Sequence, residues 1–209
     1  MLRGTFISIE GNIGAGKSTL AKGLASHFNL KLFEEPVDAN PYLEKFYAEP
    51  KKYALDMQLW LLASRFRDHV QGTELAWKGM GNDTGTNGVL FDRSLYGDSV
   101  FERVNYDLGN IDDVGHEHYH MHRDTMMRYV MAPHKVLYLK VAPEVCMERI
   151  AKRGRVFEKG ITEEYLKHLE QYHVFMLNEM RIAGSDVHTL DWSVYQSVGD
   201  LIGEIEWLL

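Results

Sequence analysis

Residues 5–19 have the sequence TFISIEGNIGAGKST, in which a β-rich run passes directly into a glycine-rich turn and then into a helical pattern. Gly11 to Ser18 match the G-x-x-x-x-G-K-[ST] pattern of a phosphate-binding loop between a strand and a helix. Gly14 and Gly16 permit backbone conformations that are closed to other residues, so successive N–H groups can converge on phosphate oxygens. The helix that follows adds free N–H donors and its dipole. The segment therefore predicts a nucleoside triphosphate site within an α/β fold.

The donor site is expected to comprise the whole loop and the start of the following helix. Its residues are Gly11, Asn12, Ile13, Gly14, Ala15, Gly16, Lys17, Ser18 and Thr19. In this pattern Lys17 bridges the β- and γ-phosphates, and the Ser18 hydroxyl ligates Mg²⁺. ATP and Mg²⁺ are thus the expected phosphoryl donor and metal ion.

Short apolar runs alternate with helical patterns along the rest of the chain. The runs begin near Thr5, Leu30, Gly88, His134 and Asp186, and the helical patterns cover 17–28, 41–77, 95–104, 116–131, 143–152, 162–182 and 195–208. Such alternation implies βαβ units, and hence a three-layer α/β/α P-loop fold around a five-stranded parallel sheet. In these sheets ligands bind beyond the carboxyl ends of the strands.

Composition bounds the remaining possibilities. The 209 residues are expected to form one domain, 1–209, and the net charge of −7 argues against a nucleic-acid partner. No apolar run approaches the roughly 20 residues that span a bilayer. Because a β-rich run begins at Thr5, no signal peptide is expected. With a single cysteine, Cys146, the chain suits a reducing compartment, and a cytoplasmic location is expected.

Two adjacent acids, Glu34 and Glu35, end the second apolar run. Adjacent strand residues point to opposite sides, so one carboxylate is expected to enter the cleft. There it could accept the proton of an attacking hydroxyl, as a general base does. The alternative is a pair of solvated surface acids, but the strand-end position beside the phosphate loop favours the functional interpretation.

Polar residues in two further segments limit which class of molecule can accept the phosphoryl group. Gln58 and Arg65 share one face of an otherwise apolar helix, where they form either a structural network or a nucleobase-reading pair. Asp92 ends the third apolar run and is expected to hold Mg²⁺ through water. Arg93 follows and is expected to neutralise phosphate charge or to clamp the acceptor. Asp98 either pairs with Arg65 or is simply an acid at a helix start.

Together, GNIGAGKST, EEPV, the MQ…SR helix, DRSLYGD and RGR…E resemble the motifs of the deoxynucleoside kinase family. The resemblance extends from Ile7 to about Phe175 and is strongest to the short bacterial-type enzymes that act on deoxyadenosine or deoxyguanosine. One motif departs from the family pattern, because the usual glutamate before Arg-Ser is Asp92 here.

The resemblance also implies roles for individual residues. It implies that Glu35 is the base that holds the 5′-hydroxyl, with Arg93 beside it, and that Gln58 hydrogen-bonds the nucleobase. It further implies an Arg65–Asp98 pair at the exocyclic edge of the base. It also implies that Phe101 stacks on the nucleobase and that Tyr47 and Glu158 clasp the sugar 3′-hydroxyl. Met57 and Trp60, beside this pocket, are expected to set its size.

A basic cluster lies at the end of the helical pattern at 143–152 and in the residues just after it. Arg149 and Arg153 are four residues apart on one helix face, and Arg155 follows Gly154 in a lid-like segment at 149–160. Guanidinium groups suit phosphate oxygens and would stabilise the transferring phosphoryl group. A solvated basic helix end would account for one or two of these arginines.

Two rival functions share parts of this pattern. A thymidylate-type nucleoside monophosphate kinase needs an extra cation beside the strand-end acid, where Glu34 would instead repel a phosphate. A nucleotide-binding regulator would not need the carboxylate, the glutamine and the arginines together. We therefore expect phosphorylation of the 5′-hydroxyl of a deoxynucleoside, with deoxyadenosine ahead of deoxyguanosine and deoxycytidine, by an enzyme that the family resemblance implies is a homodimer.

Four histidines cluster in one helical segment, at positions 116, 118, 120 and 122. His118 and His122 are spaced as metal ligands on a helix can be. No cysteine or well-placed acid near them in the sequence completes a site, so an exposed helix or a dimer surface is expected.

Overall fold

The computed structural model describes residues 4–37, 39–79 and 85–196, together with Gly199, Leu201 and Ile205. The predicted helix at 195–208 lies mostly outside these residues, as does the centre of the predicted loop at 79–88.

The five predicted runs all form strands of one sheet. They are β1 (Thr5–Gly11), β2 (Leu30–Phe33), β3 (Gly88–Asp92), β4 (Lys135–Lys140) and β5 (Asp186–Asp191). The strand order is β2-β3-β1-β4-β5, and every pairing is parallel. This confirms the predicted α/β fold with a five-stranded parallel sheet.

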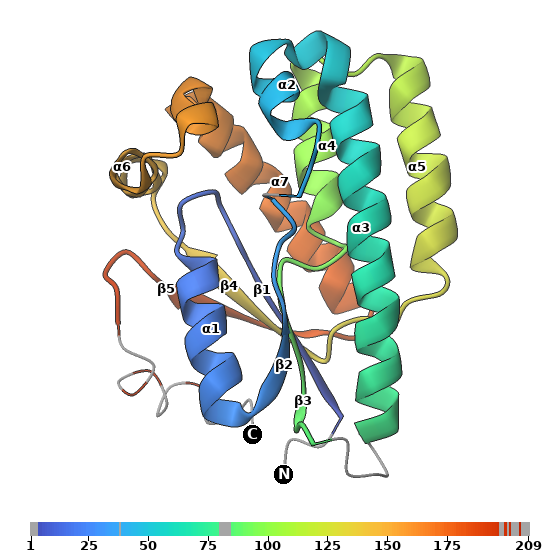
Figure 1. Cartoon of the computed structure of the whole chain (residues 1–209), viewed down its shortest axis with the longest axis vertical. Coiled ribbons are helices and arrows are strands. Elements are labelled where there is room, and N and C mark those ends of the chain that lie inside the picture. Colours follow the sequence, from blue (N-terminus) through green and yellow to red (C-terminus); the bar gives the residue numbers. More distant parts are fainter. Residues whose placement is uncertain are drawn as a thin grey trace.

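Helices cover both faces of the sheet, as Figure 1 shows, with α1 on the near face and α7 on the far face. The helices are α1 (Lys17–Phe28), α2 (Leu43–Ala48), α3 (Pro50–Gly79), α4 (Asp98–Asp107), α5 (Asp113–Met127), α6 (Pro143–Arg153) and α7 (Glu163–Ile182), with a 3₁₀ helix η1 at Val156–Gly160. Among the described helices, none is both long and apolar enough to cross a bilayer.

One predicted helix is wrong in its extent. The pattern at 41–77 forms two helices, because Glu49 leaves the helical conformation and α3 restarts at Pro50. Proline disfavours helical geometry in the residue before it and is well accommodated in the first turn of a new helix. The break lets α2 fold back over α3 at the mouth of the cavity described below.

Side-chain alternation along the strands divides the core into two faces. On one face Phe6 and Phe91 pack against α3, whose Gly72 lies directly over the Phe91 ring. On the other face Ile7 belongs to the cluster that contains Leu24 of α1. The carboxyl ends of β1, β2 and β3 therefore meet at one edge, which positions the residues that follow each of these strands.

Close packing at Gly72 generates a prediction about stability. A Cβ there would lie 2.6 Å from two atoms of the Phe91 ring. Overpacking costs about 1–3 kcal/mol, which exceeds the roughly 1 kcal/mol that alanine gains in helix propensity. We expect Gly72→Ala to lower the free energy of unfolding measured with urea. The exposed neighbour Gln71→Ala should leave it nearly unchanged, and a Gly72→Ala protein more stable than wild type would contradict this packing.

Candidate active site

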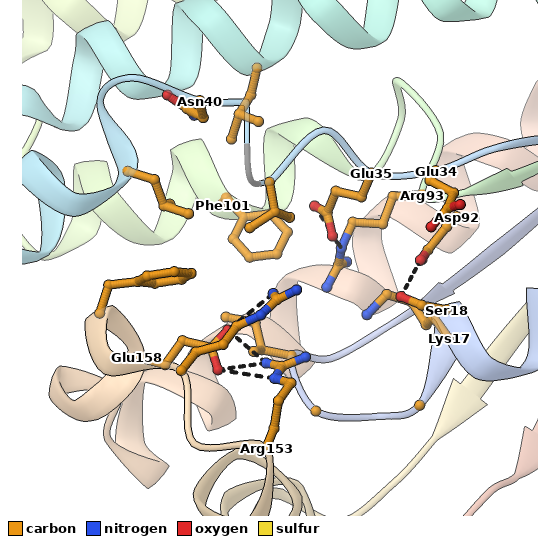
Figure 2. A pocket seen from close by; sticks show the side chains of 18 of the residues that line it. Lys17, Ser18, Glu34, Glu35, Asn40, Asp92, Arg93, Phe101, Arg153 and Glu158 are labelled. Atoms are coloured by element: carbon orange, nitrogen blue, oxygen red, sulfur yellow. Dashed lines mark hydrogen bonds and ion pairs between the residues drawn. The ribbon is translucent and has the colours of Figure 1, made fainter.

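A cavity of about 420 Å³ opens at the carboxyl edge of the sheet, between the phosphate loop, α3 and η1 (Figure 2). The predicted site residues that line it are Ile13, Gly14, Gly16, Lys17, Ser18, Thr19, Glu35, Tyr47, Met57, Gln58, Arg65, Asp92, Arg93, Phe101, Arg149, Arg153, Arg155 and Glu158. Those that lie outside its lining are Gly11, Asn12, Ala15 and Asp98. Figure 2 shows Lys17, Glu35 and Arg93 entering from one side and Arg153 and Glu158 from another.

The phosphate loop requires glycine at two positions for two reasons. Gly14 and Gly16 have φ angles of +78° and +98°, which side chains rarely adopt. A Cβ at Gly14 would lie 2.7 Å from the Cys146 carbonyl oxygen, and one at Gly16 would lie 2.8 Å from the Tyr195 ring. The loop is thus closely packed between α6 and the segment that follows β5.

Lys17 and Ser18 present their polar ends at the start of α1. Lys17 is buried and donates to the Asn12 carbonyl oxygen over 2.8 Å. Burial, reinforced by the charge of Arg93, lowers the pKa of Lys17 to about 8. Ser18 Oγ donates to Asp92 Oδ2 over 2.5 Å.

The Ser18–Asp92 pair has the composition of a magnesium site. Asp92 Oδ1 is buried and has no hydrogen-bond partner within the described part of the chain. A hydroxyl and a carboxylate beside a phosphate loop are oxygen ligands of the kind that Mg²⁺ prefers. These two residues fit the ion and would hold it, and the ion would supply positive charge to offset that of the nucleotide phosphates.

Glu34 and Glu35 diverge at the end of β2. Glu35 accepts from Arg65 Nη2 over 2.6 Å, and Arg93 Nε lies 3.2 Å from the same carboxylate oxygen. Burial alone would raise the pKa of Glu35, but the charges of Arg93 and Arg65 outweigh it and lower the pKa to about 2. Glu34 is more exposed and pairs with Lys22 over 2.9 Å. Of these two glutamates, Glu35 is therefore the one that two buried arginines hold as a carboxylate at the cavity wall.

Arg65 links Glu35 to a second, deeper carboxylate. Its guanidinium group also pairs with Asp98, which is fully buried, and Tyr119 donates to Asp98 Oδ2 over 2.6 Å. The Arg65–Asp98 pair anticipated from the sequence is thus present, but Asp98 lies behind Arg65 rather than at the cavity surface. Tyr119 was not identified from the sequence, because only the histidines of its helix were considered as functional residues.

Two amides on the cavity wall have an unpaired polar atom. Gln58 donates from Nε2 to the Asp98 carbonyl oxygen over 3.3 Å, while its Oε1 has no partner among the described residues. Asn40 Nδ2 is likewise buried without a described partner, and its Oδ1 accepts from the Tyr42 N–H over 2.9 Å. These two amides therefore offer a ligand one buried acceptor and one buried donor. Asn40 was missed, although its position before Pro41 marked a turn.

Arg93 adopts a conformation that is unusual for a residue with a side chain. Its φ angle is +67°, and its guanidinium carbon lies 4.7 Å from the centre of the Phe101 ring. The next residue, Ser94, donates to Glu10 Oε1 from its N–H over 2.8 Å and from its hydroxyl over 2.6 Å. Glu10 is buried in β1, where burial raises its pKa. Sequence reasoning missed Glu10, although an acid in an otherwise apolar strand was the available signal.

The three arginines near the lid reach the cavity but have different partners. Arg153 forms a bidentate pair with Glu158 over 2.7 Å, and Arg155 Nη1 lies 3.6 Å from the same carboxylate. Arg149 instead donates to the carbonyl oxygens of Ala15, over 3.0 Å, and of the segment after β5. Two arginines therefore meet at Glu158, while the third fastens the phosphate loop to that segment.

Aromatic rings close the cavity on the side of α2. The Tyr47 ring stacks on Phe157 of η1 at a centroid distance of 5.9 Å, and burial raises the pKa of Tyr47. Further lining residues that sequence reasoning did not identify are Leu43, Phe46, Leu61, Phe157, Tyr165 and Tyr195. Their apolar surface suits the flat faces of a sugar and a nucleobase.

Comparison with known proteins agrees with this geometry. A family model described as "Deoxynucleoside kinase" matches residues 7–203. A deoxyguanosine kinase of Dictyostelium discoideum is 37% identical over 95% of this chain and 68% of the relative. A deoxyadenosine kinase of the same organism is 36% identical over 93% of this chain and 75% of the relative. The structure of deoxyadenosine kinase from M. mycoides with bound dATP matches with a TM-score of 0.79 and 28% identity, covering 96% of this chain and 98% of that one.

The pKa of Lys17 predicts how triphosphate binding depends on pH. The protonated ammonium group attracts phosphate, so with a pKa of about 8 the affinity is complete at lower pH and falls as the pH rises through 8. We expect the association constant of a fluorescent ATP analogue to fall by up to about tenfold per pH unit above that value. Lys17→Arg should bind with an affinity that stays level to higher pH, because arginine keeps its charge. Lys22→Ala is the matched control and should retain the wild-type profile; a level wild-type profile up to pH 10 would contradict the assignment.

Proposed function

This chain belongs to the deoxynucleoside kinase family, and from that premise we propose that it transfers the γ-phosphoryl group of ATP to the 5′-hydroxyl of deoxyadenosine in nucleotide salvage. Mg²⁺ held by Ser18 and Asp92 is the metal ion in this proposal. Deoxyguanosine and deoxycytidine are the weaker acceptors. Residues 149–160 act as a lid on a single kinase domain, and the cytoplasm is the proposed location.

One observation carries the catalytic part of the proposal. Glu35 is an ionised carboxylate that shares a cavity with Lys17 and the phosphate loop. A low pKa makes Glu35 a weak base, but the transition state of phosphoryl transfer is loose and the acceptor proton can leave late. Glu35 therefore orients the hydroxyl by accepting its hydrogen bond and receives the proton as the new bond forms.

The charges around Glu35 favour a neutral acceptor. Arg65 and Arg93 face the carboxylates of Glu35 and Asp98, so the positive charges described there are already balanced. A phosphate on the acceptor would add negative charge beside Glu35 without a matching cation there. Lys22 offsets the charge of Glu34, so the charge balance around Glu35, and not repulsion by Glu34, disfavours a monophosphate acceptor.

The unpaired amide atoms support adenine as the nucleobase of the acceptor. Gln58 Oε1 is an acceptor and Asn40 Nδ2 is a donor, and both are buried at the cavity wall. Adenine presents an exocyclic amine as donor next to a ring nitrogen as acceptor, which complements such a pair. In the same orientation thymine presents the reverse order, a carbonyl facing Gln58 Oε1 and a ring N–H facing Asn40 Nδ2, so both hydrogen bonds would be lost.

A matched pair of substitutions tests Glu35 as the general base. We expect Glu35→Gln to lower kcat by about 10²- to 10⁴-fold, because the amide cannot take the proton, while the Kd for deoxyadenosine changes little. Glu34→Gln, one residue away and turned outward, should keep wild-type kcat. Both variants are assayed with labelled ATP and Mg²⁺ against the four deoxynucleosides and their four monophosphates.

The same assay contains the outcomes that would refute the proposal. A higher kcat/KM for any monophosphate would assign the chain to the monophosphate kinases. ATP binding with no phosphorylated product would assign it a regulatory role. A ranking led by thymidine would leave the family assignment in place and refute the proposed reading of the base by Gln58 and Asn40.

We also propose that the enzyme is a homodimer through α5 and α7. Large apolar side chains are exposed on α7, where Phe175 and Ile182 are 69% and 81% accessible, and on α5, where Val114 and Met121 are 75% and 59% accessible. Large apolar side chains with this exposure are typical of a subunit interface.

Light scattering tests the assembly. The wild-type mass in solution is expected to be twice 24.1 kDa. A charge in an apolar interface is costly, so Phe175→Glu should give the single-chain mass with unchanged circular dichroism. Trp77→Glu, on the exposed end of α3, is the matched control and should remain dimeric. A monomeric wild type would exclude the homodimer without bearing on the kinase assay.

A further inference from the structure

Outside the cavity, three side chains with metal-ligating groups converge from two helices. They are Glu102 of α4 and His116 and His120 of α5, and one ligand atom from each lies within 4.8 Å of the others. Glu102 Oε1 is 2.8 Å from His116 Nδ1, and Glu102 Oε2 is 3.4 Å from His120 Nε2. The expectation that no acid is well placed near the histidines was therefore wrong, because the acid comes from a different helix.

Burial makes this carboxylate unusual. The Glu102 side chain is fully buried, and its recorded ion-pair partners in the described part of the chain are the two imidazoles. Its Oε2 accepts no hydrogen bond there. A buried carboxylate needs a compensating charge, and an imidazole supplies one only when it is protonated. A divalent cation between the three groups would supply that charge and occupy the unpaired oxygen.

We propose that Glu102, His116 and His120 bind a divalent first-row transition metal of the Zn²⁺ class. Two imidazoles and one carboxylate form an established ligand set for such ions, with water in the fourth position. Tetrahedral coordination with bonds of about 2.0–2.1 Å places ligand atoms about 3.3 Å apart. The 3.4 Å contact between His120 Nε2 and Glu102 Oε2 already has this separation. His116 Nδ1 lies 2.8 Å from the other oxygen, Oε1, and must give up that hydrogen bond to bind the ion.

The surroundings of the cluster hold its ligands and leave it accessible. His116 and His120 are one helical turn apart, and their side chains are 21% and 36% exposed, so an ion can enter from solvent. The His116 ring also stacks on Tyr106 at a centroid distance of 4.1 Å, which fixes its orientation. Mg²⁺ prefers oxygen ligands, so the Mg²⁺ that accompanies ATP does not compete for this site.

A metal here would have a structural effect. The ion would join α4 to α5, and its two histidine ligands flank Tyr119 in the sequence of α5. The Tyr119 hydroxyl in turn binds Asp98, which pairs with Arg65. None of the three ligands lines the cavity, so the ion would not touch the reacting groups. The expected effect is a more stable packing of α5 against α4.

The second histidine pair on α5 provides a matched control. His118 and His122 have their Nε2 atoms 2.9 Å apart, and no acid in the described part of the chain joins them in a three-ligand group. Two imidazoles alone bind Zn²⁺ more weakly than a three-ligand set.

The test is a Zn²⁺ titration of the untagged, metal-free full chain by calorimetry, with thermal unfolding measured in parallel. One equivalent of Zn²⁺ is expected to bind tightly and to raise the Tm. Glu102→Gln and His120→Asn should each weaken binding at least about tenfold and remove the rise in Tm. The double variant His118→Asn/His122→Asn should bind as the wild type does.

Three results would overturn the proposal. In one, the wild type binds Zn²⁺ no more tightly than His120→Asn, so the cluster is hydrogen-bonded only. In another, the double variant His118→Asn/His122→Asn loses affinity for Zn²⁺ while His120→Asn keeps it. In the third, Zn²⁺ binds without raising the Tm. Circular dichroism checks that Glu102→Gln folds. If it does not fold, His120→Asn carries the comparison, because the His120 side chain is 36% exposed.

Discussion

The geometry of the cavity depends on a buried arginine that faces two carboxylates. Arg65 of α3 binds Glu35 after β2 and Asp98 at the start of α4, and Arg93 after β3 closes on the same Glu35. Three segments of the chain are thereby fixed relative to one another at the edge of the sheet. Removing one partner from such a network leaves an uncompensated buried charge, which is strongly unfavourable. The network fixes the position of the proposed base and, by the same charges, keeps it ionised.

Most of the fold follows from local patterns. Each strand is a short apolar run and each long helix has an apolar face, so element type and order were predictable. Parallel pairing follows from the alternation of strands and helices. The break at Pro50 was not predicted, because apolar periodicity continues across it and only the proline marks the new helix. The residues on the cavity wall were largely identified, since they lie in the loop motif or immediately after strands.

The partners of those residues were much less predictable. Arg149 and Arg153 occupy equivalent positions on one helix, yet one binds backbone carbonyl oxygens and the other binds Glu158. Glu10 and Tyr119 bind Ser94 and Asp98 behind the cavity wall, and neither residue belongs to a recognisable sequence motif. Glu102 is 14 residues from His116, and its proximity exists only once α4 packs against α5. Such contacts depend on tertiary packing, which periodicity and spacing do not encode.

The left-handed backbone of Arg93 has a consequence for how the protein can change. A residue with a side chain pays roughly 1–3 kcal/mol for such a conformation, whereas glycine adopts it freely. Glycine at this position would relieve the strain and would also delete the guanidinium group that faces Glu35. Loss of one partner from a buried ion network costs about 3–5 kcal/mol, which exceeds the strain that is relieved. Selection for stability and selection for turnover therefore both retain arginine here, in a backbone conformation that otherwise favours glycine.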